Sequence, residues 1–307
     1  MAVNEEATIT ATTTKASTKE AVRARRVAIE RRARLIQIGR IIAIIIIVLI
    51  SLAPLYWTFI TSIKSPAEAT ASPPTLFPHS FTLDNYIQDF TSSPFFLLDL
   101  RNSFIISVIT TVLCLLFGVL CAYALARIKF RGRTLVQATV LSVNTFPFIA
   151  IVGPLFVLFT GSFYIYNTYA ALIIPDIVLS LPLTIWLLTS FFKDLPLDLE
   201  EAARIDGDSR LGALWHVIVP LTAPGVFAAA ILSFIAVWND FIFGLNLATD
   251  SSAQPVTVAI SLFNGQYSVN YGQLAAAAMI VTVPLVILVL IFQRRIVSGL
   301  TSGAVKG

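Results

Sequence analysis

The densest group of acidic side chains in this sequence lies in the stretch DLEEAARIDGD, residues 198–208. Clustered acids or a serine–histidine pair can build a catalytic site, and an intramembrane enzyme would need such a set within its spans. The two histidines, His79 and His216, are far apart, lie outside the apolar runs and show no metal-ligand spacing. We therefore predict no catalytic residue, no metal site and no cofactor, and the acidic stretch needs another explanation.

The acidic stretch has the pattern of a short capped helix that ends in a tight turn. Asp198 and Glu201 have the spacing of a capping box, so Asp198 is predicted to cap a helix running to Ile205 or Asp206. Gly207 follows at the point where a left-handed residue commonly ends a helix.

A second helix is predicted directly after this turn, leading back into an apolar run. Asp208 or Ser209 can cap it, and Pro220 ends or kinks it. Its apolar residues fall on one helical stripe: Leu211, Leu214, Trp215 and Ile218. Residues 198–220 are named the hairpin from here on.

The first helix of the hairpin suits docking into a groove on a cytoplasmic partner. It is too polar to be buried in lipid, and Ala202 and Ala203 leave a face that another surface can approach closely. A surface hairpin that merely joins two membrane spans is the alternative.

The rest of the chain predicts a membrane protein that positions this hairpin. Hydrophobic residues make up 57% of the sequence and charged residues 12%, against about 25% charged residues in a soluble domain. The apolar residues form six runs of the length that crosses a hydrocarbon core: about 41–62, 102–126, 136–160, 168–192, 223–247 and 274–293. The predicted fold class is all-α, a polytopic protein with six transmembrane helices and a cytoplasmic hairpin. Cys114 and Cys121 lie in the second run and are expected to be packing residues.

The basic residues set the orientation of these spans. Lys and Arg gather in cytoplasmic loops, and placing both termini inside leaves only Lys64 and Arg101 of the 21 basic residues outside. This arrangement puts the hairpin in the cytoplasm and predicts contact with membrane lipid and not with nucleic acid. The predicted domains are a disordered, basic cytoplasmic tail (1–38), a six-span domain (39–294) and a cytoplasmic C-terminal tail (295–307).

Several polar residues and prolines interrupt the apolar runs. Pro147 and Pro154 fall in the third run, and Pro175 and Pro182 in the fourth. Such interruptions persist in a membrane where neighbouring helices or a wet cavity satisfy the backbone, so they mark either a pathway or ordinary kinked packing. The candidate pathway residues are Asn144, Asp176, Trp238, Asn239 and Asp240. Asp176 would face a cavity at mid-membrane, or would simply be hydrated at the outer end of its span.

The hairpin resembles the EAA signature of ABC importer permeases. EAARIDG followed by VIVPL has the family spacing at Glu201, Ala202, Ala203, Gly207 and Pro220, with Val217 and Val219 where Ile and Leu are more usual. In that family this loop inserts into the cleft of an ATP-hydrolysing subunit and transmits its motion. The resemblance implies an ATPase-coupling role for the residues Glu200, Glu201, Ala202, Ala203, Asp206, Gly207 and Pro220.

Other motifs narrow the resemblance to carbohydrate importers, over about residues 35 to 307. These motifs are FTLDNY, RNSFIIS, AYALARIKFRG, WNDF and the terminal GLTSGAVKG. The chain looks most similar to the second permease of maltose- and trehalose-type systems. In such relatives the C-terminal tail reaches into the ATPase dimer interface, and the mid-membrane sugar contacts come mostly from the other permease.

The resemblance implies an assembly in the bacterial cytoplasmic membrane. The chain has no G-x-x-x-x-G-K-[ST] phosphate loop, so ATP hydrolysis must come from partner subunits. The implied partners are a homologous second permease, two ATP-binding-cassette subunits and an extracytoplasmic sugar-binding protein, which can be a lipoprotein. The loop before the last run resembles one that contacts the binding protein in relatives, which suggests Asn264, Gly265 and Gln266 as contact residues.

Two other functions are alternatives to sugar import by alternating access. A glycerol-phosphate or other polyol importer is the first, but a phosphorylated substrate would favour basic groups along the pathway, and no Lys or Arg lies inside a predicted span. A secondary transporter is the second, but such proteins usually have more spans and internal repeats, and have no use for a capped hairpin.

Overall fold

The computed structural model describes residues 2–92, 95–263 and 270–302, and their side chains over 32–92, 95–263 and 270–293. Every regular element in these ranges is a helix, which confirms the predicted all-α class. The chain forms two compact units, residues Met1–Thr58 and Phe59–Gly307.

The first unit is most of one long helix, α1 (Ala2–Ser62). Its part Arg32–Ser62 is long and apolar enough to cross a membrane, and the large apolar side chains from Leu35 to Phe59 are exposed. The helix begins at Ala2, where the sequence predicted a disordered tail. Ala, Glu, Lys and Arg, which favour helix, are frequent in this segment.

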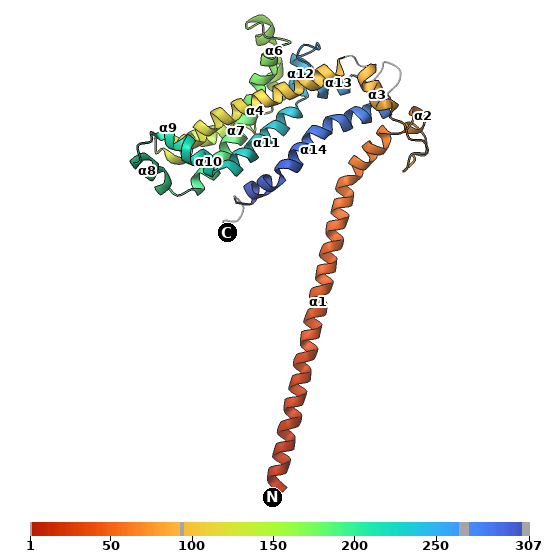
Figure 1. The fold of residues 1–307 in the computed structure, drawn as a ribbon, viewed down its shortest axis with the longest axis vertical. Coiled ribbons are helices and arrows are strands. Elements are labelled where there is room, and N and C mark those ends of the chain that lie inside the picture. The colour runs from red at the N-terminus through yellow and green to blue at the C-terminus, as the bar shows by residue number, and fades with distance from the viewer. Residues whose placement is uncertain (1, 93–94, 264–269, 303–307) are drawn as a thin grey trace. The chain divides into compact units, whose positions relative to one another are not determined.

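The second unit is built around four helices that run side by side (Figure 1). Gly118 on one of them lets it approach its neighbour closely, since a Cβ there would lie 2.7 Å from the Thr184 side chain. The four helices are α4 (Phe96–Arg127), α7 (Tyr169–Asp194), α11 (Ala223–Trp238) and α14 (Tyr271–Ser302). Short helices flank them: α2 (Pro66–Ala69), α3 (Asp84–Thr91), α12 (Ile242–Leu247) and α13 (Val256–Ser261).

The hairpin lies at one end of this bundle, on the left in Figure 1. Its first helix is α8 (Asp198–Ile205). Its second helix consists of α9 (Arg210–Ala213), a π-helical turn η1 (Leu214–Ile218) and α10 (Val219–Leu221).

The third predicted span is interrupted. It forms two helices, α5 (Arg133–Val143) and α6 (Ile149–Gly161), separated at residues 144–148. Pro147 lies in this break, and proline removes a helical hydrogen bond and clashes with the preceding turn. The fifth predicted span, 223–247, also breaks, because α11 ends at Trp238 and α12 starts at Ile242. In contrast, α7 continues through Pro175 and Pro182.

By length and composition, four helices of the described chain can cross a membrane on their own, so the predicted count of six spans is not confirmed. They are Arg32–Ser62, Phe96–Arg127, Tyr169–Asp194 and Tyr271–Gln293. A fifth crossing is possible if Arg210–Leu221 and Ala223–Trp238, which meet at an 82° bend, act as one broken span. The segment Ile149–Gly161 is apolar but shorter.

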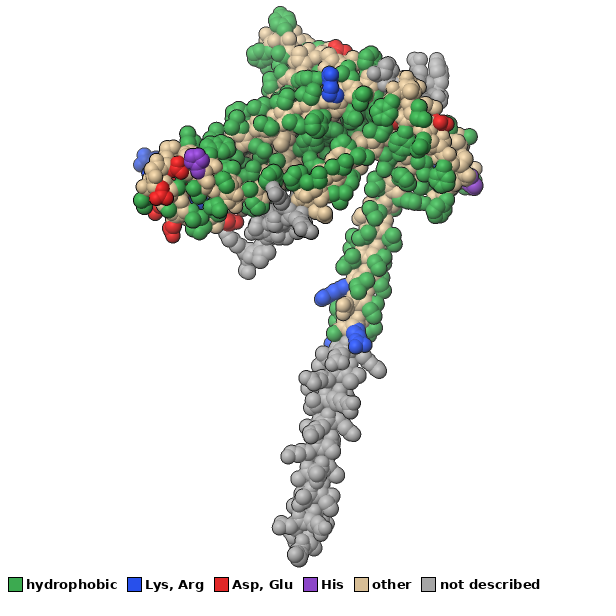
Figure 2. Space-filling view, viewed as in Figure 1, with side chains coloured by type: hydrophobic (Ala, Val, Ile, Leu, Met, Phe, Trp, Pro, Cys, Tyr) green, Lys and Arg blue, Asp and Glu red, His purple; other side chains and the backbone are tan. Residues whose placement is uncertain are grey.

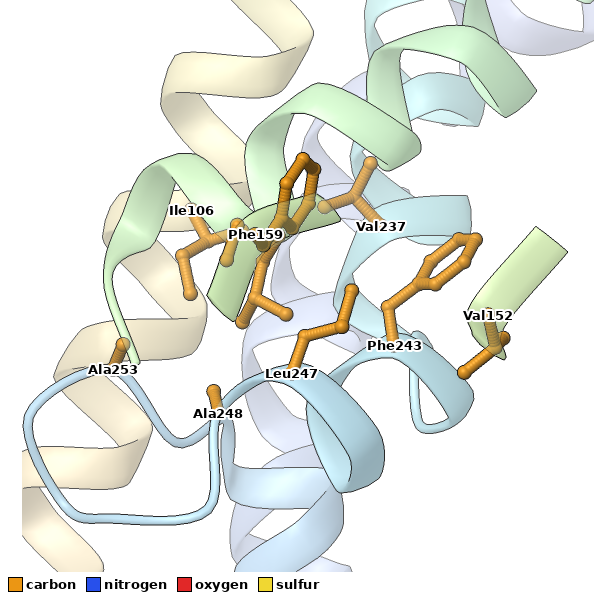
Figure 3. Close-up of a cluster of buried hydrophobic side chains, with 10 residues drawn as sticks. Ile106, Val152, Phe159, Val237, Phe243, Leu247, Ala248 and Ala253 are labelled. Atoms are coloured by element: carbon orange, nitrogen blue, oxygen red, sulfur yellow. The ribbon is translucent and has the colours of Figure 1, made fainter. Parts of the chain in front are cut away.

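Two apolar clusters hold the bundle together. One joins α6, α7, α11 and α12, and Phe159, Val237 and Leu247 point into it (Figure 3). The other joins α4, α7 and α11 to the hairpin, through Leu188 and Phe192 on one side and Leu214 and Ile218 on the other. The hairpin is therefore packed onto the bundle and does not hang from it as a free loop.

Candidate functional site

The turn of the hairpin has the conformation that the sequence predicts. Gly207 has φ +105°, a backbone conformation that is energetically unfavourable for any residue with a side chain. The Asp208 amide donates to the Ala203 carbonyl at 3.0 Å, which closes the end of α8. The Ser209 hydroxyl accepts from the Gly212 amide at 3.0 Å and caps α9.

The predicted cap at Asp198 is wrong. The residue before α8 is Leu197, which has helical angles of φ −67° and ψ −30° and makes no side-chain cap. Asp198 therefore lies inside the first turn, where its side chain cannot turn back to cap the helix. Acids in this turn still stabilise the helix by lying near the positive end of its dipole.

The four residues of the predicted apolar stripe differ in burial in the second helix of the hairpin. Leu214 and Ile218 are buried, whereas Leu211 and Trp215 are 56% and 42% exposed. The π-helical turn over 214–218 widens the helix and changes the angular position of the residues that follow. Pro220 lies just before the 82° bend into α11, as the prediction of a kink requires.

Glu200 fastens α8 to the end of α4. The Tyr123 hydroxyl donates to Glu200 Oε1 at 2.7 Å, and Arg127 Nε lies 3.8 Å from Glu200 Oε2. Arg127 also donates to the Leu195 carbonyl at 3.0 Å, and its side chain is only 4% exposed. Glu200 thus points toward the bundle, and Ala203 on the same helix is buried as well.

The opposite face of α8 is open. Glu201, Ala202, Asp206 and Gly207 are exposed. Ile205, a large apolar side chain, is 86% exposed. Figure 2 shows acidic side chains gathered at this end of the molecule, beside an otherwise mostly hydrophobic body. The exposed face of α8 thus carries polar side chains around Ile205, as a docking surface would.

A polar pocket of about 380 Å³ lies between the end of α4 and α8. Its charged and hydroxyl side chains are Tyr123, Arg127, Lys129, Glu200, Glu201, Arg204 and Arg210. Sequence reasoning missed Tyr123 and Arg127. They are four residues apart at the cytoplasmic end of an apolar run, and this spacing puts them on one helix face. That spacing could have indicated that they act together.

A second pocket, of about 240 Å³, lies within the bundle and brings together three of the five candidate pathway residues. Asp176 comes from α7, and Asn239 and Asp240 come from the break between α11 and α12. The sequence did not single out the other lining residues, which are Phe148, Leu179, Ser180, Ala236, Phe241 and Ile242.

The two carboxylates of this pocket differ in their partners. Asp240 accepts hydrogen bonds from the amides of Phe243 and Gly244, at 3.2 and 3.0 Å, and so caps α12. Asp176 is 4% exposed, and its Oδ2 has no hydrogen-bond partner among the described residues. It is therefore buried inside the bundle, which excludes a hydrated position at the end of the span.

The remaining predicted residues lie elsewhere. Trp238 is buried, stacks on Phe234 and donates to the Val281 carbonyl at 3.3 Å, so it packs α11 against α14. Asn144 is exposed at the end of α5 and does not line the pocket. Asn264, Gly265 and Gln266 lie outside the described residues.

Comparison with known proteins gives one consistent result. The family model "Binding-protein-dependent transport system inner membrane component" matches residues 114–302, which include the whole hairpin. The chain is 43% identical over 268 residues to the sulfoquinovosyl glycerol transport system permease protein SmoH of Agrobacterium fabrum, covering 87% of this chain and 93% of that protein. It is 42% identical over 269 residues to the trehalose/maltose transport system permease protein MalG of Thermococcus litoralis, covering 87% and 96%.

A solved structure has the same fold. A bacterial ABC transporter involved in the import of the acidic polysaccharide alginate contains a chain that superposes with a TM-score of 0.72. The match covers 85% of this chain and 96% of that chain, at 22% identity. With the capped hairpin, the apolar bundle and the family match over residues 114–302, the chain belongs to the binding-protein-dependent transport system inner membrane components, the multi-pass permeases of ABC importers.

Proposed function

We propose that this chain is a permease subunit of an ATP-driven importer of a neutral di- or oligosaccharide, such as trehalose or maltose. The observation that carries the proposal is the hairpin: one face of α8 is fastened to α4 through Glu200, and the other face is exposed and polar around Ile205. The chain has no phosphate loop, so another subunit must supply the energy of ATP hydrolysis. The exposed face of α8 offers that subunit a surface to bind. Permeases of trehalose and trehalose/maltose transport systems are among its relatives.

The proposed assembly contains this chain, a homologous second permease, two ATP-binding-cassette subunits and an extracytoplasmic sugar-binding protein. A related alginate transporter, 17% identical, is known in complex with its ligand-bound periplasmic protein. The ATPase subunits bind the exposed face of the hairpin, which includes Glu201, Ala202, Asp206 and Gly207. Both chain termini lie in the cytoplasm.

Contacts between the hairpin and the bundle can carry a movement of the ATPase subunits to the membrane helices. When ATP closes the two ATPase subunits, the hairpin moves with the subunit that holds it. Glu200 and Arg127 pass the displacement to α4, and Leu214 and Ile218 pass it to α7 and α11. Because these helices form one packed cluster, they move together as rigid elements. The bundle then opens outward to accept sugar, and ATP hydrolysis resets it.

A second candidate substrate is an anionic sugar derivative. The relative that transports sulfoquinovosyl glycerol favours it, since that compound carries a sulfonate. The pocket in the bundle argues for a neutral sugar, because its lining contains two carboxylates and no Lys or Arg. A negatively charged substrate would find no opposite charge there, unless a partner subunit supplied it.

The test is to purify the partner sugar-binding protein and measure its affinity for trehalose, maltose, sulfoquinovosyl glycerol and glycerol phosphodiesters by calorimetry. The whole complex is then placed in liposomes, and its ATPase activity is measured with the binding protein loaded with each compound. We expect a neutral disaccharide to bind and to stimulate ATP hydrolysis. Stimulation by a charged compound alone would establish the second candidate, and stimulation by none would refute the sugar importer.

A further inference from the structure

We propose that the pocket lined by Asp176, Ser180, Asn239 and Asp240, named the Asp176 pocket, is a place where this subunit itself binds the sugar during translocation. The inference rests on the proposed function and adds a substrate contact on this chain. Its ligand class is a neutral polyhydroxyl compound. The volume of about 240 Å³ holds several water molecules at about 30 Å³ each, and so has room for the hydroxyl groups of one sugar ring.

The first observation is the state of Asp176. Its side chain is 4% exposed, and its Oδ2 has no hydrogen-bond partner in the described part of the chain. A carboxyl group in this position is costly to bury unless a donor reaches it. Sugar hydroxyls are such donors.

The second observation is how the other polar groups are placed. Ser180 lies one helical turn after Asp176 on α7, so both are on the same face. Asp240 is held by the amides at the start of α12, and Asn239 donates to the Ile235 carbonyl at 2.7 Å. These anchored groups present a fixed set of oxygen acceptors, which is how a preorganised site limits the entropy lost on binding.

The third observation is the character of the remaining walls. Phe148 and Phe241 line the same pocket, and their rings can cover the apolar C–H face of a sugar. A site with oxygen acceptors, two aromatic rings and no basic side chain fits a neutral sugar better than an anion.

The fourth observation is where the pocket opens. Phe148, Ala236 and Asn239 are exposed at its edge. An amide and carboxylates that faced lipid would be unfavourable, and ionisable residues in membranes usually face a cavity or a protein partner. The open side of the pocket is therefore assigned to the translocation path beside the second permease.

The test compares two buried carboxyls in the complete complex, reconstituted in liposomes with its binding protein and radiolabelled trehalose. Asp176→Asn should lower trehalose import about tenfold, the effect of losing one hydrogen bond to the sugar. ATP hydrolysis stimulated by the loaded binding protein should stay within about twofold of wild type, so less sugar enters per ATP. The matched control is Asp99→Asn. Asp99 is 3% exposed, also has a buried oxygen without a partner, and lies outside the pocket.

Asp176→Asn importing trehalose at the rate of Asp99→Asn would overturn the site while leaving the proposed function intact. If no sugar-loaded binding protein stimulates the wild-type complex, the function itself fails. A second measurement does not depend on the stability of Asp176→Asn. In Asn239→Cys, trehalose with binding protein and ATP should slow modification by a methanethiosulfonate reagent about fivefold or more, relative to Asn144→Cys. Equal modification of Asn239→Cys with and without trehalose would also refute the site.

Discussion

At the scale of single residues, two neighbouring glutamates of the hairpin have different surroundings. Glu200 is directed toward α4, where Tyr123 and Arg127 bind it. Glu201, the next residue, is exposed. Successive residues of a helix differ by about 100° in direction, so one can hold the helix to the bundle while the next is free for a partner.

Replacing Glu200 should therefore weaken the fold, and replacing Glu201 should not. In Glu200→Ala, Arg127 keeps a buried charge without its carboxylate, at a cost of about 1–3 kcal/mol. We expect a lower Tm for the detergent-purified permease with Glu200→Ala and an unchanged Tm with Glu201→Ala. Glu201→Ala should instead weaken binding of the ATPase subunits in a pull-down. Equal Tm values for the two variants would contradict the role of Glu200.

Asp89 on α3 makes a pH-dependent contribution to stability. Its side chain is fully buried, and this burial raises the pKa of its carboxyl from 3.8 to about 7, against a smaller opposing effect of Gln273. The unfolded chain loses this proton near pH 4, while the folded protein keeps it until about pH 7. Stability is therefore highest at low pH and decreases as the pH rises through this window.

Asp89→Asn should remove this cost. The variant should raise Tm more at pH 8, where wild type must bury the carboxylate, than at pH 5, where wild type buries the neutral acid. Asp84→Asn, an exposed position on the same helix, is the control and should change Tm little at either pH. Thermal unfolding at the two pH values measures the difference, and equal gains at both would argue against a buried carboxylate.

At the scale of elements, the hairpin is a rigid part because both of its helices are fastened. Its turn requires Gly207 in a left-handed conformation, Ser209 caps the second helix, and Leu214 and Ile218 bury that helix in the bundle. The hairpin can thus transmit displacement, whereas a flexible loop would absorb it.

Gly207→Ala should disturb this element through its backbone alone. A Cβ at Gly207 has nothing within 4 Å, so the expected cost of about 1–2 kcal/mol comes from φ +105°. The matched control is Gly153→Ala, which also adds a Cβ into open space but in α6 with ordinary helical angles. We expect lower sugar import per ATP for Gly207→Ala and unchanged import for Gly153→Ala, with both inserted normally in the membrane. Full coupling in Gly207→Ala would show that the turn can be strained without consequence.

At the scale of the whole molecule, the apolar composition of the chain is matched by an apolar exposed surface. Large apolar side chains are exposed along α1, α4 and α14, as in Ile50, Phe117 and Ile291. Such a surface belongs in lipid or against another subunit. The basic residues of the described chain favour placing the hairpin and the loop at Arg131 on the cytoplasmic side.

This orientation can be tested with reporter fusions. In the proposed orientation, Arg131 and the C-terminus lie in the cytoplasm, so green fluorescent protein fused at either point should fluoresce. Ser80 and Ser251 lie outside in this orientation, so alkaline phosphatase fused after either residue should be active. Inverted activity at any of the four sites would require a different topology, and the 82° bend before α11 would then be the first place to re-examine.

The sequence by itself determined the class of the protein and the nature of its hairpin. Apolar runs of membrane length, the bias of Lys and Arg, and the cap–turn–cap order around Gly207 and Ser209 are local properties, which one chain displays without knowledge of its partners in space. The prolines of the third run indicated an interruption, which the structure places at residues 144–148. The end of α11 at Trp238 was not predicted, because hydropathy measures transfer to lipid and not helical continuity.

Which residues meet depends on the three-dimensional packing of the helices. It brought Asp176 of α7 to Asn239 and Asp240, more than 60 residues away in sequence, and put Trp238 into packing against α14. It also separated Glu200, bound to Tyr123 and Arg127, from the exposed Glu201. The physical reason is that the direction of a side chain depends on the rotation of its helix and on the neighbours it meets, and both are set by long-range packing that spacing along one helix does not specify.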